Sequence, residues 1–470
     1  MSDHPMPPVA TDHGDGSARS PALAGLTTRL FGLISLIGLA GAFVGLTTSS
    51  FWADELYTAW VLGDGRSFDG ALARMATDAV PPGFYITLFG FCRLFGVSDT
   101  SLRLFSALCA TGAVAVFLVA LRRHASLTAR LFAAALATTS SIWFFQAQNA
   151  RSNSLTFLLG AILLGLSLRL IEHRTTEPRR QGGTLAVLGG VMAYGSTVHF
   201  YFLYECLAVL IVLAAYAPRY RPVLILFGGV LLAGAGAYTG LFIRQHSQLA
   251  LSANWIPNTP RWYATQLYHA LLGAAGPLAL TALAIAAGCW IRSRRPGRAA
   301  VRSWSDARNR LSRIDPLLAL CAGVPVILVG GALTSSILLT PNLTDRNLLV
   351  CSPFLWGLYA LAYDRGVRPA PLPLKRLAEG VLAGLLIASA AEVVGRWVPR
   401  NEPFREAAAW IATVPGCREQ DILVVTSDEK AWSAPGYMEQ VIAAETGHYL
   451  QPFAQPRVAY MEDVMRGRLP

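Results

Sequence analysis

The chain has 470 residues, of which 53% are apolar and only 14% are charged, and its mean hydropathy is +0.43. Soluble domains carry about 25% charged residues, and the interior of a soluble protein of this size could not hide so much apolar surface. Long apolar stretches recur between residues 30 and 397, so lipid is the solvent for most of the chain. As the class of the chain as a whole, a coiled coil, a disordered tail, a secreted disulfide scaffold and a cytosolic enzyme are excluded.

The formal net charge is +11, from 39 basic and 28 acidic residues. Most of the arginines fall in short loops between apolar stretches. That pattern sets membrane topology, so we expect no nucleic-acid partner. The seven cysteines include no C-x-x-C spacing, and six lie in or beside apolar stretches, which indicates small hydrophobic side chains rather than disulfides or metal ligands.

We expect an all-α polytopic protein with about eleven spanning helices, since about 20 apolar residues cross a bilayer. The first 28 residues are polar and rich in Pro and Gly, which predicts a disordered cytoplasmic tail. They lack the basic start and the cleavage site of a signal peptide, so the first span is expected to stay attached. The candidate spans are 29–48, 101–121, 127–145, 153–171, 184–198, 201–217, 223–243, 264–291, 316–338, 348–363 and 377–395.

Residues 81–97 decide the topology. This stretch is apolar but short, and it contains Arg93. If it lies in the membrane interface as an amphipathic or re-entrant helix, 23 of the 39 basic residues fall in inside segments, 8 in outside loops and the other 8 in the outside tail. The positive-inside rule then predicts a cytoplasmic N-terminus and a periplasmic C-terminus in a bacterial inner membrane. The loop at 49–100, which contains the interfacial helix, becomes the first periplasmic loop.

The membrane domain is expected to cover 29–397, and a small periplasmic α/β domain to cover 398–470. In this tail FREAAAWIATV has helical spacing, DILVVTS reads as a short buried strand, and GYMEQVIAAETG predicts a second helix that ends at Gly447. No nucleotide-binding phosphate loop or zinc motif occurs.

Two carboxylates directly follow the first span. The first outside loop begins FWADELYTAW, which places Asp54 and Glu55 at the membrane surface. Adjacent residues point to different sides of a helix or strand, so the two are not expected to share one task. A partly desolvated carboxylate is a stronger base than one in water, which makes Asp54 a candidate general base. The position leaves two alternatives open, a solvated loop charge and a helix N-cap.

The next motif is TDAVPPGFYITLF. Two prolines can begin a helix but cannot continue one, so Pro81 and Pro82 are expected to start the interfacial helix with Tyr85 on its first turn. Asp78 lies three residues before the prolines, either as an ordinary loop acid or as a site carboxylate.

The order of these motifs resembles that of the GT-C superfamily of membrane glycosyltransferases. D-E-x-Y at 54–57 and P-P-x-x-Y at 81–85 are followed by a span and by QAQNARSNSLTFLL. The pattern is most similar to the family of protein mannosyltransferases and lipid A aminoarabinose transferases (glycosyltransferase family 39). The resemblance covers roughly residues 25–220 and continues more weakly through DRNLLVCSPFLWGLYAL at 345–361 and FREAAAWIATVPGCREQDILVV in the tail.

The resemblance implies an enzyme whose sugar donor is carried on a polyprenyl phosphate. An acceptor hydroxyl on a lipid, a glycan or a protein would attack it on the periplasmic side, usually with inversion. Asp54 would be the essential first-loop acid that takes the acceptor's proton. The departing phosphate needs cations that stay charged in a low dielectric, which favours arginine. The candidates are Arg346, Arg151 and Arg261, followed by Arg66 and Arg74.

Each supporting residue has a second interpretation. Arg346 stands beside Asp345 at a helix mouth, where it could equally anchor the helix in the interface. Arg151, in the QNAR turn, has the same alternative. His199 ends a span in STVHFYFLYE, as a functional group or as a helix cap. Glu205 lies inside a span, where an ionisable group indicates function or a pair with a neighbouring helix.

The remaining members of the expected site are Glu55, Tyr57, Asp78 and Tyr85. Outside acids could hold a divalent cation through water, or the site could need none. Val80 stands where the family usually has His or Lys before the two prolines. This departure keeps a non-catalytic envelope assembly protein open as an alternative. A transporter or flippase of lipid-linked sugar would need polar groups at the membrane midplane, whereas the candidates gather on one side.

Overall fold

The fold comes from a computed structural model, which describes residues 21–63, 65–75, 81–245, 256–271, 315–339, 341–395, 404–414, 421–426, 443, 447–450 and 455–460. In chain order the helices are α1 (Pro21–Gly41), α2 (Ala53–Leu62), α3 (Phe68–Met75), α4 (Gly83–Phe95), α5 (Asp99–Ala120), α6 (Leu127–Thr138), α7 (Ser141–Ala147), α8 (Asn153–Glu172), α9 (Gly182–Val198), α10 (Phe200–Tyr216), α11 (Arg221–Gln245), α12 (Pro260–Leu271), α15 (Pro316–Leu338), α16 (Asp345–Leu348), α17 (Ser352–Ala362), α18 (Leu372–Gly395) and α19 (Phe404–Ile411). The strands are β1 (Asp421–Thr426) and β2 (Gln455–Tyr460).

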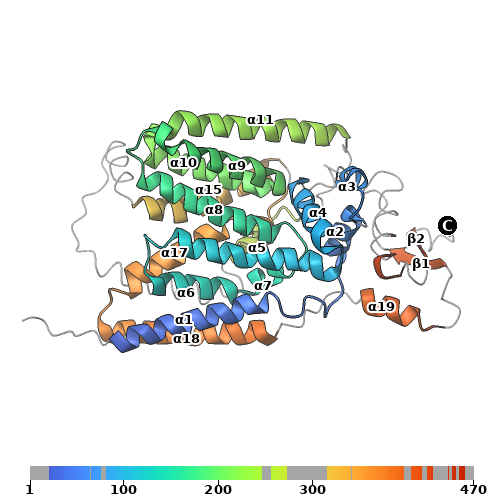
Figure 1. The fold of residues 1–470 in the computed structure, drawn as a ribbon, viewed down its shortest axis with the longest axis horizontal. Helices are drawn as coiled ribbons and strands as arrows, with labels where there is room; N and C mark the ends of the chain where they lie inside the picture. The colour runs from blue at the N-terminus through green and yellow to red at the C-terminus, as the bar shows by residue number, and fades with distance from the viewer. Residues whose placement is uncertain are drawn as a thin grey trace, which may run out of the picture.

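The long helices lie side by side in a bundle (Figure 1). α5 packs along α8, α1 along α6, and α10 along α15. Phe117 of α5 and Phe157 of α8 both pack on Trp356 of α17, at ring-centroid distances of 5.7 and 6.1 Å. Within the described residues, five helices are long and apolar enough to cross a membrane, and shorter apolar helices accompany them. The chain is a polytopic all-α membrane protein, as expected.

Helix boundaries follow local capping. α5 begins with a reciprocal capping box, in which the backbone N–H of Ser101 donates to Ser98 Oγ at 3.1 Å and that of Ser98 donates to Ser101 Oγ at 2.9 Å. The expected span 127–145 is broken at Thr139 and Ser140, where α6 ends and α7 begins. α1 begins at Pro21 rather than at residue 29, so residues 21–28 are helical and not part of a disordered tail. Residues 1–20 lie outside the described part of the chain. The second half of the expected span 264–291 lies outside it as well.

α2, α3 and α4 gather at one end of the bundle, and α4 is steeply inclined to α5 (Figure 1). α4 begins directly after Pro82, with Tyr85 in its first turn, as the two prolines predict. Its first residue must be small, because a Cβ on Gly83 would lie 2.6 Å from the carbonyl oxygen of Thr197. α4 therefore packs closely on the end of α9, next to His199.

The C-terminal segment packs on the same end of the bundle. β1 and β2 pair in parallel, with Asp421 opposite Gln455, and with α19 they form the small α/β unit that the sequence predicts. Most of the second predicted helix, 436–447, lies outside the described residues, but residues 447–450 are helical, so the expected helix end at Gly447 was wrong.

This segment is held mainly through Asp99, the first residue of α5. Arg405 forms an ion pair with Asp99, and Tyr449 Oη donates to Asp99 Oδ2 at 2.8 Å. His448 Nε2 lies 3.2 Å from the other carboxylate oxygen. Arg405 also donates to the carbonyl oxygen of Ser49 at 3.1 Å. One carboxylate at a helix start therefore joins the tail to the bundle and to the first loop.

Candidate active site

α2 turns its two adjacent carboxylates in different directions. Asp54 and Glu55 both lie in its first turn, where the helix dipole favours negative charge. The side chain of Glu55 is 1% exposed, whereas that of Asp54 is 38% exposed. The two side chains therefore point in different directions, as their adjacent positions predict; their separate tasks stay a prediction. The N-cap residue is Trp52, without a side-chain cap bond, so the N-cap interpretation of Asp54 was wrong.

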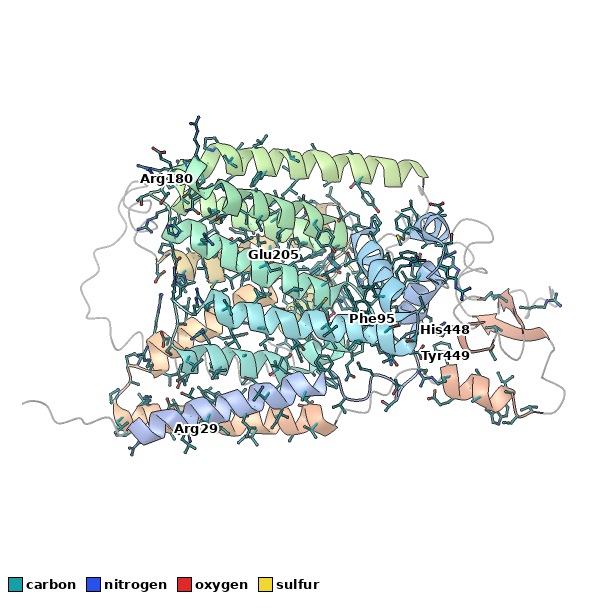
Figure 2. The ribbon with its side chains drawn as sticks, viewed as in Figure 1. Arg29, Phe95, Arg180, Glu205, His448 and Tyr449 are labelled. Carbon is teal, nitrogen blue, oxygen red and sulfur yellow. The ribbon has the colours of Figure 1, made fainter. Side chains whose placement is uncertain are left out.

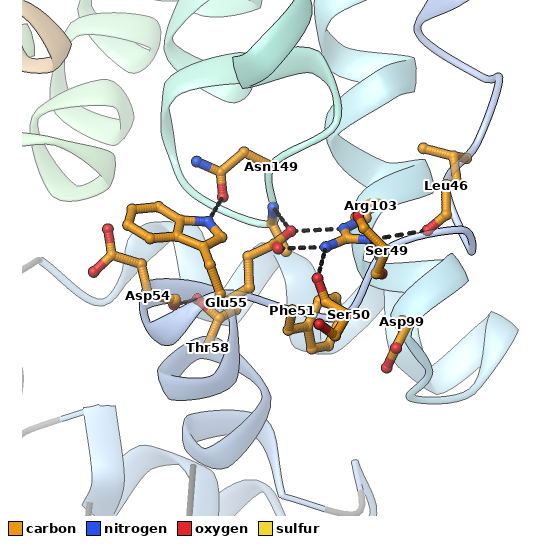
Figure 3. A network of polar contacts seen from close by, with 12 residues as sticks. Leu46, Ser49, Ser50, Phe51, Asp54, Glu55, Thr58, Asp99, Arg103 and Asn149 are labelled. Atoms are coloured by element: carbon orange, nitrogen blue, oxygen red, sulfur yellow. Dashed lines mark hydrogen bonds and ion pairs between the residues drawn. The ribbon is translucent and has the colours of Figure 1, made fainter. Parts of the chain in front are cut away.

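Glu55 forms a buried ion pair with Arg103 of α5 (Figure 3). Arg103 Nε and Nη2 donate to the two carboxylate oxygens at 2.8 and 2.6 Å, and the backbone N–H of Ala150 donates to the same carboxylate at 2.9 Å. Burial raises the pKa of Glu55, and the hydrogen bonds and the charge of Arg103 oppose that rise. Glu55 therefore holds the 148–152 turn against α2.

Arg103 also organises the chain before α2. It donates to the carbonyl oxygens of Leu46, Ser49 and Ser50 at 3.1, 2.8 and 3.0 Å, and its guanidinium lies 4.9 Å from the ring centroid of Phe51. From the sequence Arg103 counts only as a basic residue at a helix mouth. A buried arginine with this many acceptors holds the first loop in one shape.

Asp54 pairs with Arg346 across the site. Arg346 Nη1 donates to Asp54 Oδ2 at 3.1 Å, and its guanidinium lies 4.7 Å from the ring centroid of Trp52. Both charged side chains are partly exposed, and an ion pair of this kind contributes little free energy, so other ligands can compete for either group. Arg346 lies in α16, whose first backbone amide, that of Asp345, donates to Gln266 Oε1 at 2.7 Å.

Arg151 brings the QNAR turn into the site. Its Nη1 donates to Tyr85 Oη at 3.1 Å and to the backbone carbonyl of Asp54 at 3.4 Å. Tyr85 is fully buried, so it positions this guanidinium from the start of α4. The D-E-x-Y, P-P-x-x-Y and QNAR motifs, which are up to about a hundred residues apart, therefore meet.

His199 caps α10 through its ring. Its Nδ1 accepts from the backbone N–H of Tyr201 at 3.2 Å, in agreement with the cap interpretation. Burial, together with the charge of Arg151, lowers the pKa of His199 to about 4. The ring is neutral at pH 7, and because Nδ1 accepts, Nε2 carries the proton and can donate to a ligand.

These side chains face one cavity of about 620 Å³. Asp54, Arg151, His199 and Arg346 all line it. α12 contributes a wall that sequence reasoning missed, with Trp262, Gln266 and His269. The aromatic residues near 262 were visible in the sequence, but they also fit an ordinary interfacial belt. Trp262 instead donates its indole N–H to the carbonyl oxygen of Leu343 at 3.1 Å and holds the segment before Arg346.

Other expected residues do not line the cavity. Arg261 is exposed on the first turn of α12, and Tyr57 packs on Trp60 at 5.3 Å. Arg74 donates to the carbonyl of Val61 at 3.0 Å, and the carbonyl of Arg66 accepts from Arg93.

Three further predictions concern a buried acid, the residues around Asp78 and a metal. Glu205 is fully buried in α10, where its carboxyl oxygens have no hydrogen-bond partner among the described residues. Asp78 and Val80 lie outside the described residues. Over the described ranges, no three metal-ligating acids, histidines or cysteines cluster, and the divalent cation stays an untested prediction.

The arrangement of the helices makes the chain a polytopic all-α protein with a GT-C-like fold. Solved structures with this fold include ArnT from Cupriavidus metallidurans bound to undecaprenyl phosphate, at a TM-score of 0.52 and 13% identity, over 96% of this chain and 88% of that one. The apo state of ArnT gives a TM-score of 0.52 at 12% identity, over 93% and 86%. Neither a protein-family model nor a curated protein matches the sequence.

Proposed function

We propose that this protein is an inner-membrane glycosyltransferase that moves a sugar from a polyprenyl-phosphate donor to an acceptor hydroxyl on the periplasmic side. The observation that carries the proposal is the cavity in which the Asp54 carboxylate faces the guanidinium of Arg346, with Arg151 and His199 on the same walls. The ArnT structure with undecaprenyl phosphate supports a polyprenyl phosphate as the lipid partner.

In this mechanism the three cavity donors bind the phosphate of the donor lipid. Arg346 and Arg151 offer charged hydrogen bonds, and the neutral His199 offers its Nε2–H. The incoming phosphate competes with Asp54 for Arg346, which releases the carboxylate toward the acceptor. The acceptor oxygen attacks the anomeric carbon, the bond from that carbon to the phosphate oxygen breaks, and the electron pair leaves with the lipid phosphate. Asp54 takes the acceptor's proton, and attack from the face opposite the phosphate inverts the centre.

The charge distribution supports the proposed orientation. With 23 basic residues in inside segments and 8 in outside loops, the positive-inside rule favours a cytoplasmic N-terminus. The cavity and the tail then face the periplasm, the compartment in which lipid, glycan and protein acceptors of the envelope are found.

The test is sugar transfer in membrane vesicles by the full chain and by Asp54→Asn. We expect the variant to lose at least about a hundredfold in rate, the scale of a general base, while it still binds undecaprenyl phosphate. Asp69→Asn, an exposed acid in the same loop, is the matched control and should transfer normally. Normal turnover in Asp54→Asn would overturn the assignment. Movement of lipid-linked sugar across the liposome bilayer, without transfer of the sugar to an acceptor, would favour a flippase instead. Mass spectrometry of envelope glycolipids with and without the protein would identify the acceptor.

A further inference from the structure

A second cavity lies at the end of the bundle opposite the site. It has a volume of about 810 Å³ and sits between the C-terminal ends of α5 and α8 and the turns that follow them. Arg29 and Arg180 mark the same end of the molecule, far from His448 and Tyr449 (Figure 2). The cavity shares no lining residue with the site around Asp54.

The rim of this groove is basic. Arg122, Arg123 and Arg169 line it together with the single carboxylate of Glu172. Glu172 lies 3.6 Å from Arg123 and 3.2 Å from the ring of His124, so it is already engaged. In the part of the chain that the structure describes, no hydrogen bond or ion pair involves the guanidinium of Arg122 or Arg169. Among the described residues, the rim therefore presents two guanidinium groups without an anionic partner.

The wall of the groove is apolar and faces outward. Val119 of α5 is 60% exposed, and Leu166 of α8 lies on the same surface. The two helices approach closely beneath it, because a Cβ on Gly165 would lie 3.3 Å from Ala120 Cβ. A shallow apolar channel along two spanning helices accommodates an acyl chain, and the rim above it lies at headgroup depth.

We propose that this groove binds an anionic phospholipid. The guanidinium groups of Arg122 and Arg169 hold its phosphate, and an acyl chain lies along Val119 and Leu166. The choice of occupant rests on charge complementarity, because three arginines against one glutamate leave an excess positive charge that a zwitterionic headgroup does not balance. The proposal does not depend on the catalytic assignment.

The experiment is native mass spectrometry of the full-length protein, released from nanodiscs that contain phosphatidylglycerol or phosphatidylcholine. We expect wild type to retain phosphatidylglycerol in preference to phosphatidylcholine. The double variant Arg122→Gln/Arg169→Gln should bind it at least about tenfold more weakly, since each charged hydrogen bond removed is worth a factor of this order. Arg179→Gln/Arg180→Gln removes the same charge at the same end but outside the groove, and it should bind like wild type.

A second variant keeps the proposal testable if Arg122→Gln/Arg169→Gln fails to fold, because it is expected to gain affinity. Glu172→Gln frees Arg123 and raises the charge of the rim, so it should bind phosphatidylglycerol more tightly than wild type. Equal affinity in all variants, or an equal loss in both double variants, would overturn the proposal. Displacement of the bound lipid by undecaprenyl phosphate, at lower concentrations than phosphatidylglycerol itself requires, would overturn the choice of a phospholipid.

Discussion

The two ends of the bundle use arginine in different ways. At the site end, Arg103 is 2% exposed and has a carboxylate and three backbone carbonyls as acceptors. At the opposite end, Arg123 is 66% exposed and reaches one glutamate at 3.6 Å. Both are basic residues at the mouth of the same helix, α5. The positive-inside rule explains why arginines occur at helix ends, but only burial and acceptors separate an arginine that shapes a site from one that orients a helix.

The largest effect on stability is expected from the buried ion pair between Glu55 and Arg103. Glu55→Gln or Arg103→Met each leaves a charged partner in a buried position, which costs about 3–5 kcal/mol of unfolding free energy. The double variant Glu55→Gln/Arg103→Met should lose less than the sum of the two single losses. Thermal unfolding in detergent measures both. Additive losses would show that the two side chains do not act as a pair.

The next effect concerns the phosphate. Arg346→Gln should lower kcat/KM for transfer from a polyprenyl-phosphate donor by about a hundredfold or more, the usual cost of losing one stabilising donor. Arg261→Gln carries the same change on the exposed face of α12 and should keep nearly full activity. If the two variants lose activity equally, Arg346 has no special place in the cavity.

A smaller effect depends on pH. Native His199 has a pKa of about 4, below its ordinary value of 6.5, so the unfolded chain binds this proton more readily between those values. The contribution of His199 to stability is present above pH 6.5 and is lost as the pH falls toward 4. His199→Gln keeps an acceptor for Tyr201 but cannot titrate, and its unfolding temperature should fall less on acidification. Parallel curves for wild type and variant would contradict this.

The smallest effect on stability is expected at the end of the bundle opposite the site, where Arg123 is exposed. Arg123→Gln removes a solvated ion pair and should change the unfolding free energy by no more than about 0.5 kcal/mol. Sugar transfer by this variant should match that of wild type in the same vesicles. A clear loss of transfer would mean that the two ends of α5 are coupled.

The sequence predicted the order of the helices and named four of the residues that line the cavity, Asp54, Arg151, His199 and Arg346. Apolar length fixes where spanning helices lie, and the positive-inside rule brings Asp54, Arg151, His199 and Arg346 to one side. It could not show that Glu55 turns inward to Arg103, because the rotation of a short helix depends on its tertiary packing. It also missed α12, since Trp262 and Gln266 have nothing in their local pattern to separate a cavity wall from an interfacial belt.

The shared carbonyl of Ser49 has a consequence for the C-terminal segment. It accepts from Arg103 inside the bundle and from Arg405 in α19. A protease cut or a truncation just before Arg405 would therefore remove one of the two clamps on the peptide that leads into α2, although nothing in that segment lines the cavity in the described structure. The C-terminal segment therefore stabilises the loop beside the cavity. Truncated variants should be assessed by the conformation of residues 46–51 as well as by their yield.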